Sequence, residues 1–298
     1  MKGIILAGGN GSRLYPLTNS TSKHLLPVYD KPMVYYPMAV LMEAGIRDIL
    51  LISTPRDLPQ YRLLLGDGNR FGLRIEYAVQ AEPNGLAEAF SIGAAFIGTD
   101  DVALILGDNL FHGGTLPGIL REAVAGLEGC VLFGSEVPDP HRYGVAEVDP
   151  SGVLLSVEEK PEHPRSRTAV TGLYLYDNRV LDIAAGIKPS DRGELEITDV
   201  NLAYLEEGRA RLVDLGPDVL WLDAGTEESL LDAGSRVREI AHRDGVRVAC
   251  LEEVALRKGY IDADACLALG AGLRGSPYGE YVVRAALRAR MRPGAGDG

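Results

Sequence analysis

The chain has 298 residues, 46% of them hydrophobic, and a formal net charge of −12 at pH 7. Its length suits one large α/β domain or two small ones, and its negative charge argues against nucleic acid or an anionic membrane as a partner. Because the three cysteines lack metal-ligand spacing, and no segment resembles a signal peptide or a spanning helix, we expect a soluble, cytoplasmic protein with reduced thiols.

Strand-like and helix-like segments alternate through the first half of the chain. Continuous apolar runs of strand length occupy residues 3–6, 48–54, 73–79, 102–108 and 130–137. Helical patterns lie between them at residues 33–44, 86–96 and 116–125. Uninterrupted apolar strands are typical of a parallel sheet that helices cover on both faces. This half therefore predicts an α/β fold, doubly wound around a mostly parallel central sheet.

The pattern changes after Pro138. Residues 144–161 predict a β-hairpin, residues 170–177 a further strand, and residues 193–208 a helix. From Glu227 to Arg292 the chain is mostly helical in pattern. We therefore expect the following division: an α/β core over residues 1–240 with an insertion at about 138–220, a helical C-terminal segment over 241–292, and a disordered tail over 293–298.

A glycine-rich loop follows the first predicted strand. Its glycines are Gly8, Gly9 and Gly11. They would let backbone N–H groups approach phosphate oxygens, while Ser12 offers a donor and Arg13 a forked cation. Leu14 stands where the dinucleotide-binding fingerprint needs its third glycine, which disfavours a dehydrogenase, and the lysine of a P-loop is missing. For the glycines alone, a tight turn with a solvated arginine is the alternative.

A series of motifs along the chain then points to a family. "GGNGSRLYPLT" and "SKHLLPVYDKPMVYYP" are followed in order by "GLAEAF", "LILGDNLF", "RYGVAEVD", "EEKP", "AVTGLYLYD", "RGELEITDVN", "WLDAGT" and "RKGYI". This series strongly resembles the sugar-1-phosphate nucleotidylyltransferases, and within them most closely the glucose-1-phosphate thymidylyltransferases. It covers nearly the whole chain, so it is far more specific than any single motif.

The resemblance implies a Rossmann-like nucleotidyltransferase core with a sugar-side insertion. It also implies a reaction in which dTTP and α-D-glucose 1-phosphate give dTDP-glucose and pyrophosphate by in-line displacement assisted by Mg²⁺. Such a reaction brings two polyanions together, so the protein must supply cations and alignment rather than a covalent nucleophile. The family further implies a homotetramer with contacts through the C-terminal helices, and a role in deoxysugar nucleotide biosynthesis.

On the nucleotide side, the resemblance assigns Arg13 and Lys23 to the triphosphate, where a transition-state donor is typically worth ~10²–10³ in rate. Asp108 and Asp223 would together hold one Mg²⁺, since carboxylate oxygens suit a hard cation. In the family, the glutamine that matches Gln80 recognises the base. A primary amide suits thymine or uracil, but a rotated amide also suits cytosine or adenine, so Gln80 by itself does not select thymine.

Gly85 would lie alongside the base. On the sugar side, the resemblance assigns the remaining pocket residues to the hexose and its phosphate: Asn109, Tyr143, Gly144, Glu159, Lys160, Val170 and Arg192. Lys160 would bind the sugar phosphate and take part in catalysis, and Arg192 would add a second cation. Trp221, the only tryptophan, would either stack beneath the site or fill the core.

One residue departs from the family. His24 follows Lys23 where glutamine is usual, so the choice of base, or of deoxyribose over ribose, is open. A UTP-dependent uridylyltransferase is therefore an alternative within the same enzyme class. A catalytically silent nucleotide-sugar sensor is an alternative outside it, although such a protein would be expected to lack part of the cation and carboxylate set that is present here.

Overall fold

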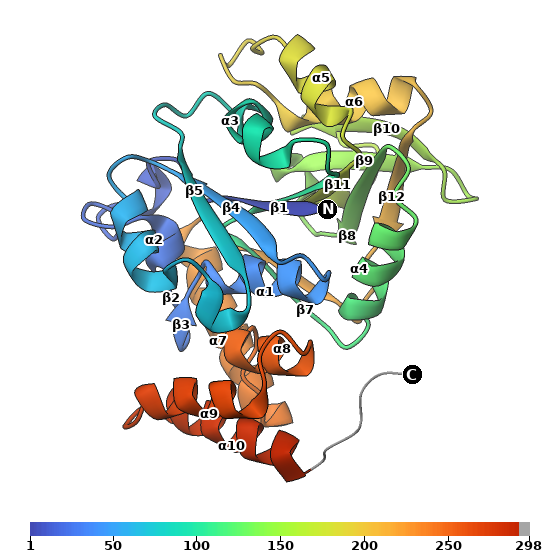
Figure 1. The fold of residues 1–298 in the computed structure, drawn as a ribbon. Coiled ribbons are helices and arrows are strands. Elements are labelled where there is room, and N and C mark those ends of the chain that lie inside the picture. Colours follow the sequence, from blue (N-terminus) through green and yellow to red (C-terminus); the bar gives the residue numbers. More distant parts are fainter. Residues whose placement is uncertain (292–298) are drawn as a thin grey trace.

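The computed structural model describes residues 1–291, and within them a nine-stranded mixed sheet forms the centre of the molecule (Figure 1). Seven strands lie in the order β10-β9-β11-β6-β1-β4-β5, while β8 pairs with both β11 and β12. The strands of this sheet are β1 (Lys2–Leu6), β4 (Asp48–Ser53), β5 (Arg74–Val79), β6 (Val102–Leu106), β8 (Cys130–Glu136), β9 (Gly144–Val148), β10 (Leu154–Glu159), β11 (Thr168–Tyr176) and β12 (Ala210–Asp214).

The sheet has a parallel part and an antiparallel part. β6, β1, β4 and β5 run parallel, as the apolar runs predicted. β11 runs antiparallel to β6, β8 and β9, and the predicted hairpin is formed by β9 and β10. The α/β fold class is therefore confirmed, and most of the antiparallel pairing enters where the sequence pattern changes after Pro138.

Helices cover both faces of the sheet (Figure 1). In the first 210 residues they are α1 (Tyr35–Glu43), α2 (Leu58–Leu65), α3 (Glu88–Ile97), α4 (Leu116–Ala125), α5 (Val180–Gly186) and α6 (Ile197–Glu206). Successive residues of β1 point to opposite faces. Ile5 packs in one buried cluster with Met38 of α1, and Ile4 packs in another with Phe90 of α3. Burial of each such side chain stabilises the fold by about 1.5–3 kcal/mol.

Between Glu227 and Met291 the chain is mostly helical, as predicted. Its helices are α7 (Glu227–Asp244), α8 (Leu251–Arg257), α9 (Ala263–Gly272) and α10 (Pro277–Met291). α9 and α10 pack together at the lower end of Figure 1, and α8 contacts α1 of the core. The predicted tail at 293–298 lies outside the described residues, and the division into domains stays a prediction. Within residues 1–291, no helix is both long and apolar enough to cross a membrane.

Two predicted elements have different bounds in the structure. The strand predicted at 102–108 ends at Leu106, and a separate strand β7 (Asn109–His112) pairs with β13 (Leu220–Asp223). The helix predicted at 193–208 begins only at Ile197, because the backbone of Leu195 is engaged with Asn84 and Ala87. A short hairpin of β2 (Pro27–Val28) and β3 (Lys31–Pro32) precedes α1.

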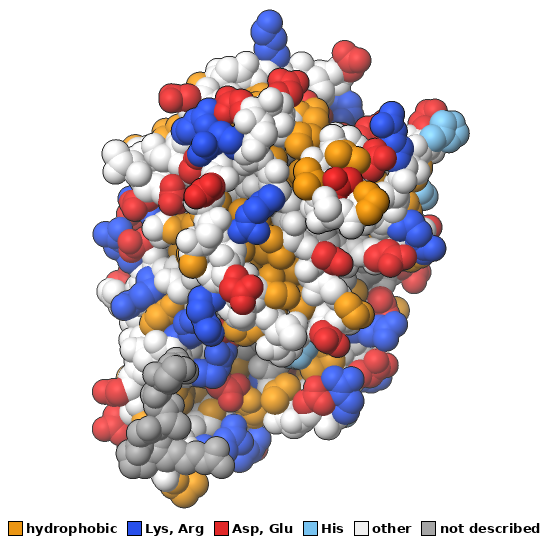
Figure 2. All heavy atoms as spheres, turned by 90° about the vertical axis from the view of Figure 1, so that its right-hand side faces the viewer, with side chains coloured by type: hydrophobic (Ala, Val, Ile, Leu, Met, Phe, Trp, Pro, Cys, Tyr) orange, Lys and Arg blue, Asp and Glu red, His pale blue; other side chains and the backbone are white. Residues whose placement is uncertain are grey.

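The molecular surface carries charges of both signs. On the face in Figure 2, acidic and basic side chains are interspersed, and apolar side chains are visible between them.

Candidate active site

A pocket of about 410 Å³ lies at the carboxyl ends of the parallel strands. Leu6 and Gly8 border it from the end of β1, Gln80 from the end of β5, and Leu106 from the end of β6. The opposite wall comes from β9, β10, β11 and the start of α6. In open α/β sheets this edge is where ligands bind.

Nearly all the residues that the sequence singled out line this one pocket. They are Gly8, Gly9, Arg13, Lys23, His24, Gln80, Gly85, Asp108, Asn109, Tyr143, Gly144, Glu159, Lys160, Val170, Arg192, Trp221 and Asp223. Gly11 and Ser12 are not among the lining residues. Gly11 adopts a left-handed conformation (φ 60°) against Thr18, and Ser12 is an exposed residue that begins a 3₁₀ turn. Both residues lie in the loop between Gly9 and Arg13, which do line the pocket, and their expected contacts with phosphate stay a prediction.

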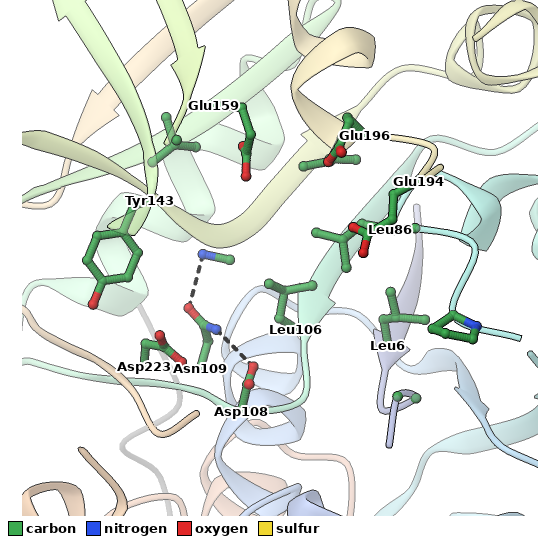
Figure 3. Close-up of a pocket in the computed structure, with 18 of the residues that line it drawn as sticks. Leu6, Leu86, Leu106, Asp108, Asn109, Tyr143, Glu159, Glu194, Glu196 and Asp223 are labelled. Carbon is green, nitrogen blue, oxygen red and sulfur yellow. Dashed lines mark hydrogen bonds between the residues drawn. The ribbon is translucent and has the colours of Figure 1, made fainter. Parts of the chain in front are cut away.

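Asp108 and Asp223 face the same small space from different segments. The pairing of β7 with β13 sets Asp223 opposite Asn109, the residue after Asp108. A Cβ atom added to Gly225 would lie 2.9 Å from Asp223 Oδ1, 3.6 Å from Asp108 Oδ2 and 3.3 Å from Arg13 Nη2. The absence of a side chain at Gly225 thus leaves a space bordered by two carboxylates and a guanidinium. Figure 3 shows Asp108, Asn109 and Asp223 together on one side of the pocket.

The two carboxyl groups differ in their electrostatic surroundings. Burial by itself would raise the pKa of Asp108, but the positive charge of Lys23, the neighbouring His24 and the hydrogen bonds from Lys23 and Asn109 together outweigh burial and hold this pKa well below its usual value. Lys23 Nζ donates to Asp108 Oδ2 at 2.5 Å. For Asp223, burial raises the pKa, and the negative charge of Asp108 raises it further. Asp108 is therefore held firmly ionised, whereas Asp223 takes up a proton more easily.

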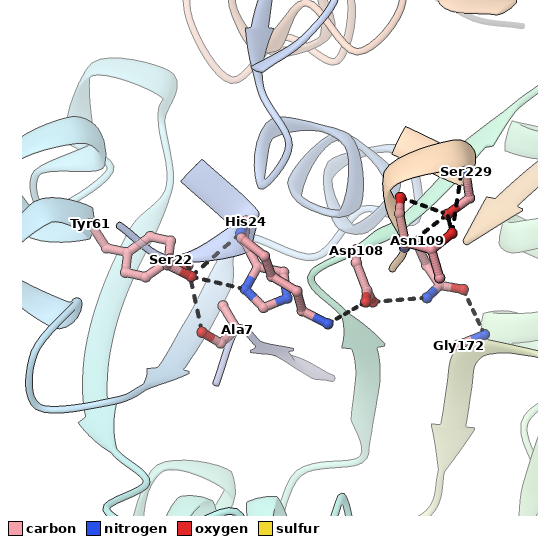
Figure 4. A network of polar contacts seen from close by, with 10 residues as sticks. Ala7, Ser22, His24, Tyr61, Asp108, Asn109, Gly172 and Ser229 are labelled. Atoms are coloured by element: carbon pink, nitrogen blue, oxygen red, sulfur yellow. Dashed lines mark hydrogen bonds and ion pairs between the residues drawn. The ribbon is translucent and has the colours of Figure 1, made fainter. Parts of the chain in front are cut away.

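His24 lies in a chain of polar contacts with Ser22 and Tyr61 (Figure 4). Its side chain is almost completely buried, and its Nδ1 is 3.2 Å from Ser22 Oγ, which in turn lies 2.7 Å from the hydroxyl of Tyr61. Burial lowers the pKa of His24 to about 3, so the ring is neutral at physiological pH. The ring also packs on Gly107, where an added Cβ would lie 2.6 Å from His24 Cδ2. The His24 ring thus lies against the backbone that leads from β6 to Asp108.

Asn109 joins the acidic pair to the opposite wall. Its Oδ1 accepts hydrogen bonds from the backbone N–H of Gly172 (3.0 Å) and from Trp221 Nε1 (2.6 Å), and its Nδ2 donates to Asp108 Oδ1 (3.2 Å). The Trp221 ring packs edge-on against Tyr143, with 5.1 Å between the ring centroids. Trp221 therefore both lines the pocket and packs, partly buried, against the hydrophobic core.

The insertion supplies a second cationic group. Glu159 accepts a hydrogen bond from Thr198 Oγ1 (2.7 Å), and it lies 3.2 Å from Lys160 Nζ and 3.5 Å from Arg192 Nη2. Lys160 has a left-handed backbone (φ 43°), and its N–H donates to the carbonyl of Tyr143 at 3.0 Å. A strained lysine backbone of this kind is held only by its surroundings, and here it directs Lys160 to the pocket rim.

Sequence reasoning missed three charged residues of the pocket: Arg142, Glu194 and Glu196. Arg142 Cζ lies 5.5 Å from the centre of the Tyr143 ring, and Glu196 Oε1 accepts from Arg192 Nη2 at 2.8 Å. All three fall inside the motifs "RYGVAEVD" and "RGELEITDVN", so their place beside Tyr143 and Arg192 in these motifs was the available signal. Figure 3 places Glu159, Glu194 and Glu196 across the pocket from Asp108.

Comparison with known proteins identifies the class to which this fold and site belong. The family model described as nucleotidyl transferase matches residues 2–240, and the chain belongs to this family. Relatives named glucose-1-phosphate thymidylyltransferase match it over nearly its whole length. The one from Xanthomonas campestris pv. campestris (strain B100) is 53% identical over 97% of this chain and 98% of its own. The one from Mycobacterium tuberculosis (strain ATCC 25618 / H37Rv) is 52% identical over 95% and 98%.

Solved structures agree with this assignment. A Bacillus anthracis protein in complex with a sucrose superposes with a TM-score of 0.75 at 42% identity, covering 80% of this chain and 96% of its own. A UDP-glucose pyrophosphorylase complexed with UDP-glucose superposes with a TM-score of 0.68 at 25% identity, covering 80% and 98%.

Proposed function

We propose that this chain transfers the thymidylyl group of dTTP to α-D-glucose 1-phosphate, giving dTDP-glucose and pyrophosphate. The observation that supports this most directly is the presence of two separate cationic groups around one pocket. Arg13 and Lys23 lie at the ends of the parallel strands, and Lys160 and Arg192 lie on the insertion. Two anionic substrates that react with each other need such an arrangement, and the names of the relatives suggest which substrates they are.

The first group would bind the triphosphate. Lys23 is anchored by Asp108, so its ammonium group is held in place before the nucleotide arrives. Arg13 would bind the departing β- and γ-phosphates with its planar fork of donors. Gly8 and Gly9 would allow the backbone to approach the phosphates closely. Charge that develops during displacement at the α-phosphorus would thus meet fixed positive groups.

Mg²⁺ fits the space beside Gly225. Asp108 and Asp223 offer two convergent carboxylates, and substrate oxygens and water would supply the other ligands that a hard cation needs. When bound, the ion would supply charge neutralisation at the α-phosphate. Within residues 1–291, no cluster of three or more potential metal-ligating side chains of the His, Cys, Asp and Glu type is present, so this site would depend on the bound nucleotide.

The second group would bind and orient the sugar phosphate. Lys160 and Arg192 would hold the phosphate, whose free oxygen attacks the α-phosphorus, and Glu159 would accept hydrogen bonds from the hexose hydroxyls. An added Cβ on Gly144 would lie 3.5 Å from Glu159 Oε2, so this glycine leaves room beside the carboxylate. Tyr143, Val170 and Trp221 would form the apolar wall.

We also infer a cytoplasmic homotetramer. Support comes from the general prevalence of closed symmetric homo-oligomers and from exposed apolar side chains on the C-terminal helices, including Leu287 and Met291. Light scattering after size-exclusion chromatography would give the mass directly. A mass near four times 32.0 kDa is expected, and a monomer would contradict the inference.

The reaction is tested by offering dTTP, UTP, dCTP, ATP and GTP separately with glucose 1-phosphate and Mg²⁺, and by measuring pyrophosphate release. We expect dTTP to give the highest kcat/KM and chelation of the metal to abolish turnover. A clear preference for UTP would establish the uridylyltransferase alternative. Release of no pyrophosphate from any nucleotide, with nucleotide binding intact, would instead support a silent sensor.

A further inference from the structure

We propose that Glu88 is a positioning residue that fixes the orientation of the Gln80 amide and so determines which bases the pocket accepts. This inference rests on the proposed function, in which Gln80 faces the base of the nucleoside triphosphate. Glu88 is the first residue of α3, is partly buried and does not itself line the pocket. Its influence on the substrate must therefore pass through Gln80.

Both amide hydrogens of Gln80 are used inside the protein. Gln80 Nε2 donates to Glu88 Oε2 at 2.8 Å and to the carbonyl of Gly85 at 3.2 Å. A primary amide has only two N–H groups, so neither remains for a ligand. The residue is also well anchored, because its side chain is 6% exposed and its backbone N–H donates to the carbonyl of Ser53 at 2.9 Å.

The amide oxygen points to the pocket instead. An added Cβ on Gly8 would lie 2.8 Å from Gln80 Oε1, so the oxygen lies directly beside a glycine that lines the pocket. Within residues 1–291, no side chain or backbone N–H donates to this oxygen. Gln80 therefore meets a bound base as a hydrogen-bond acceptor only.

Glu88 makes the opposite orientation of the amide unfavourable. An ionised carboxylate only accepts hydrogen bonds, so a rotated amide would set its oxygen against Glu88 and against the Gly85 carbonyl. Glu88 is held by a second contact, because its Oε1 accepts from Asn84 Nδ2 at 2.8 Å.

The Gly85 carbonyl is fixed as well. Leu195 N–H donates to the carbonyl of Asn84 (2.7 Å), and Ala87 N–H donates to the carbonyl of Leu195 (3.1 Å). An added Cβ on Gly85 would lie only 2.4 Å from the backbone of Leu195. Gly85 is thus clamped by the sugar-side segment, and both acceptors of the Gln80 amide have fixed positions.

An acceptor at this place distinguishes the pyrimidines by their N3 atom. Thymine and uracil carry a hydrogen on N3, whereas cytosine presents a lone pair there, which an amide oxygen repels. Glu88 would therefore favour dTTP and UTP over dCTP and would not separate dTTP from UTP. A site discriminates strongly between two substrates when the wrong substrate leaves a buried polar group of the site without a hydrogen bond.

The test compares three variants. Glu88→Met removes the hydrogen-bond acceptor and keeps a side chain of similar length, whereas Glu88→Gln keeps one acceptor oxygen. Asn84→Ala is the control, because it removes only the second hydrogen-bond partner of Glu88. The ratio of kcat/KM for dTTP to that for dCTP is measured with saturating glucose 1-phosphate. We expect Glu88→Met to lower this ratio at least tenfold, mainly through the two KM values. Glu88→Gln should lower it less, and Asn84→Ala should leave it within about twofold.

Unchanged ratios in both Glu88 variants, or an equal loss of kcat/KM for both nucleotides, would assign Glu88 a merely structural role and overturn the proposal. If Glu88→Met does not fold, Glu88→Gln decides the question by the same ratio. Equilibrium binding of dTTP and dCTP to the wild-type protein and the variants separates this proposal from the proposed function. Selective binding without turnover would contradict the enzymatic reaction and still support the role of Glu88.

Discussion

The two cationic groups of the pocket differ in burial. The side chains of Lys23 and Asp108 are 16% and 9% exposed and pair at 2.5 Å. Lys160 and Arg192 are 48% and 45% exposed, and their ion pairs with Glu159 are longer. Breaking a buried pair leaves an uncompensated charge at a cost of about 3–5 kcal/mol, whereas an exposed pair is worth only about 0–1 kcal/mol. Lys23 is therefore held in place in advance, although Arg13, the other cation of the proposed nucleotide side, is exposed. Lys160 and Arg192, on the proposed sugar-phosphate side, have charges that can reorient when a substrate binds.

Substitution of the acidic pair should have the largest effect. We expect Asp108→Asn and Asp223→Asn each to lower kcat by at least ~10³, because each would remove a ligand of the proposed metal site and Asp108→Asn would also remove the anchor of Lys23. Steady-state kinetics measures the loss, and circular dichroism checks that the fold remains. Asp100→Asn is the control, because Asp100 is an exposed carboxylate that pairs with the N-terminal ammonium group and does not line the pocket. Near-normal turnover in both active-site variants would refute the shared metal site.

A smaller and more selective effect is expected at the exposed cationic group. Lys160→Ala should raise the KM for glucose 1-phosphate by ~10–100-fold, which corresponds to about 1.4–2.8 kcal/mol of lost binding. The KM for dTTP should change by no more than about threefold, because Lys23 and Arg13 are untouched. Initial rates with each substrate varied in turn give both constants. Equal increases in the two KM values would remove Lys160 from the sugar-phosphate side.

The buried His24 predicts a pH effect on stability. Its pKa is about 3 in the folded protein and near the ordinary histidine value of 6.5 in the unfolded chain, so unfolding takes up a proton below pH 6.5. The contribution of the neutral ring is complete above pH 6.5 and is lost as pH falls toward 3, by up to about 1.4 kcal/mol per pH unit. Denaturant unfolding at several pH values gives the free energy of unfolding of the wild type and of His24→Gln. As pH falls below 6.5, this free energy should decrease less steeply in the variant. Parallel curves would mean that His24 is already accessible to protons.

The smallest effect concerns the wall between the two groups. Trp221→Phe removes the hydrogen bond to Asn109 but keeps an aromatic ring near Tyr143. Such a loss is worth about 1 kcal/mol, so the KM for glucose 1-phosphate should rise roughly fivefold. Trp221→Phe with unchanged kinetics but lowered stability would show that the residue serves only packing.

Much of the fold could be predicted from local sequence patterns. The run at 48–54 predicted the strand Asp48–Ser53 closely, because a buried parallel strand is apolar throughout. The end of β6 could not be predicted locally, since the pairing of β6 with β1 stops at Leu106 and the chain from Asn109 pairs with the distant strand β13 instead. The late start of α6 likewise depends on backbone hydrogen bonds between Leu195 and residues near Gly85. Both errors arise from tertiary contacts that no local pattern contains.

Less of the site could be predicted from the sequence. The motifs predicted which residues surround the pocket. For Gly85 they indicated only a position beside the base, whereas the structure also shows that a side chain there would collide with the backbone of Leu195. The burial that neutralises His24 and the fixed orientation of the Gln80 amide follow from the surroundings of these side chains. Residue identity alone predicted neither.

The central claim is that the two cationic groups bring a sugar phosphate oxygen to the α-phosphorus of dTTP. dTTP labelled at the α-phosphorus, incubated with glucose 1-phosphate and Mg²⁺, tests this most directly. We predict that the label passes into a nucleotide sugar in step with pyrophosphate release. Label that appears in free dTMP, or that becomes bound to the protein as a lasting product, would contradict the account.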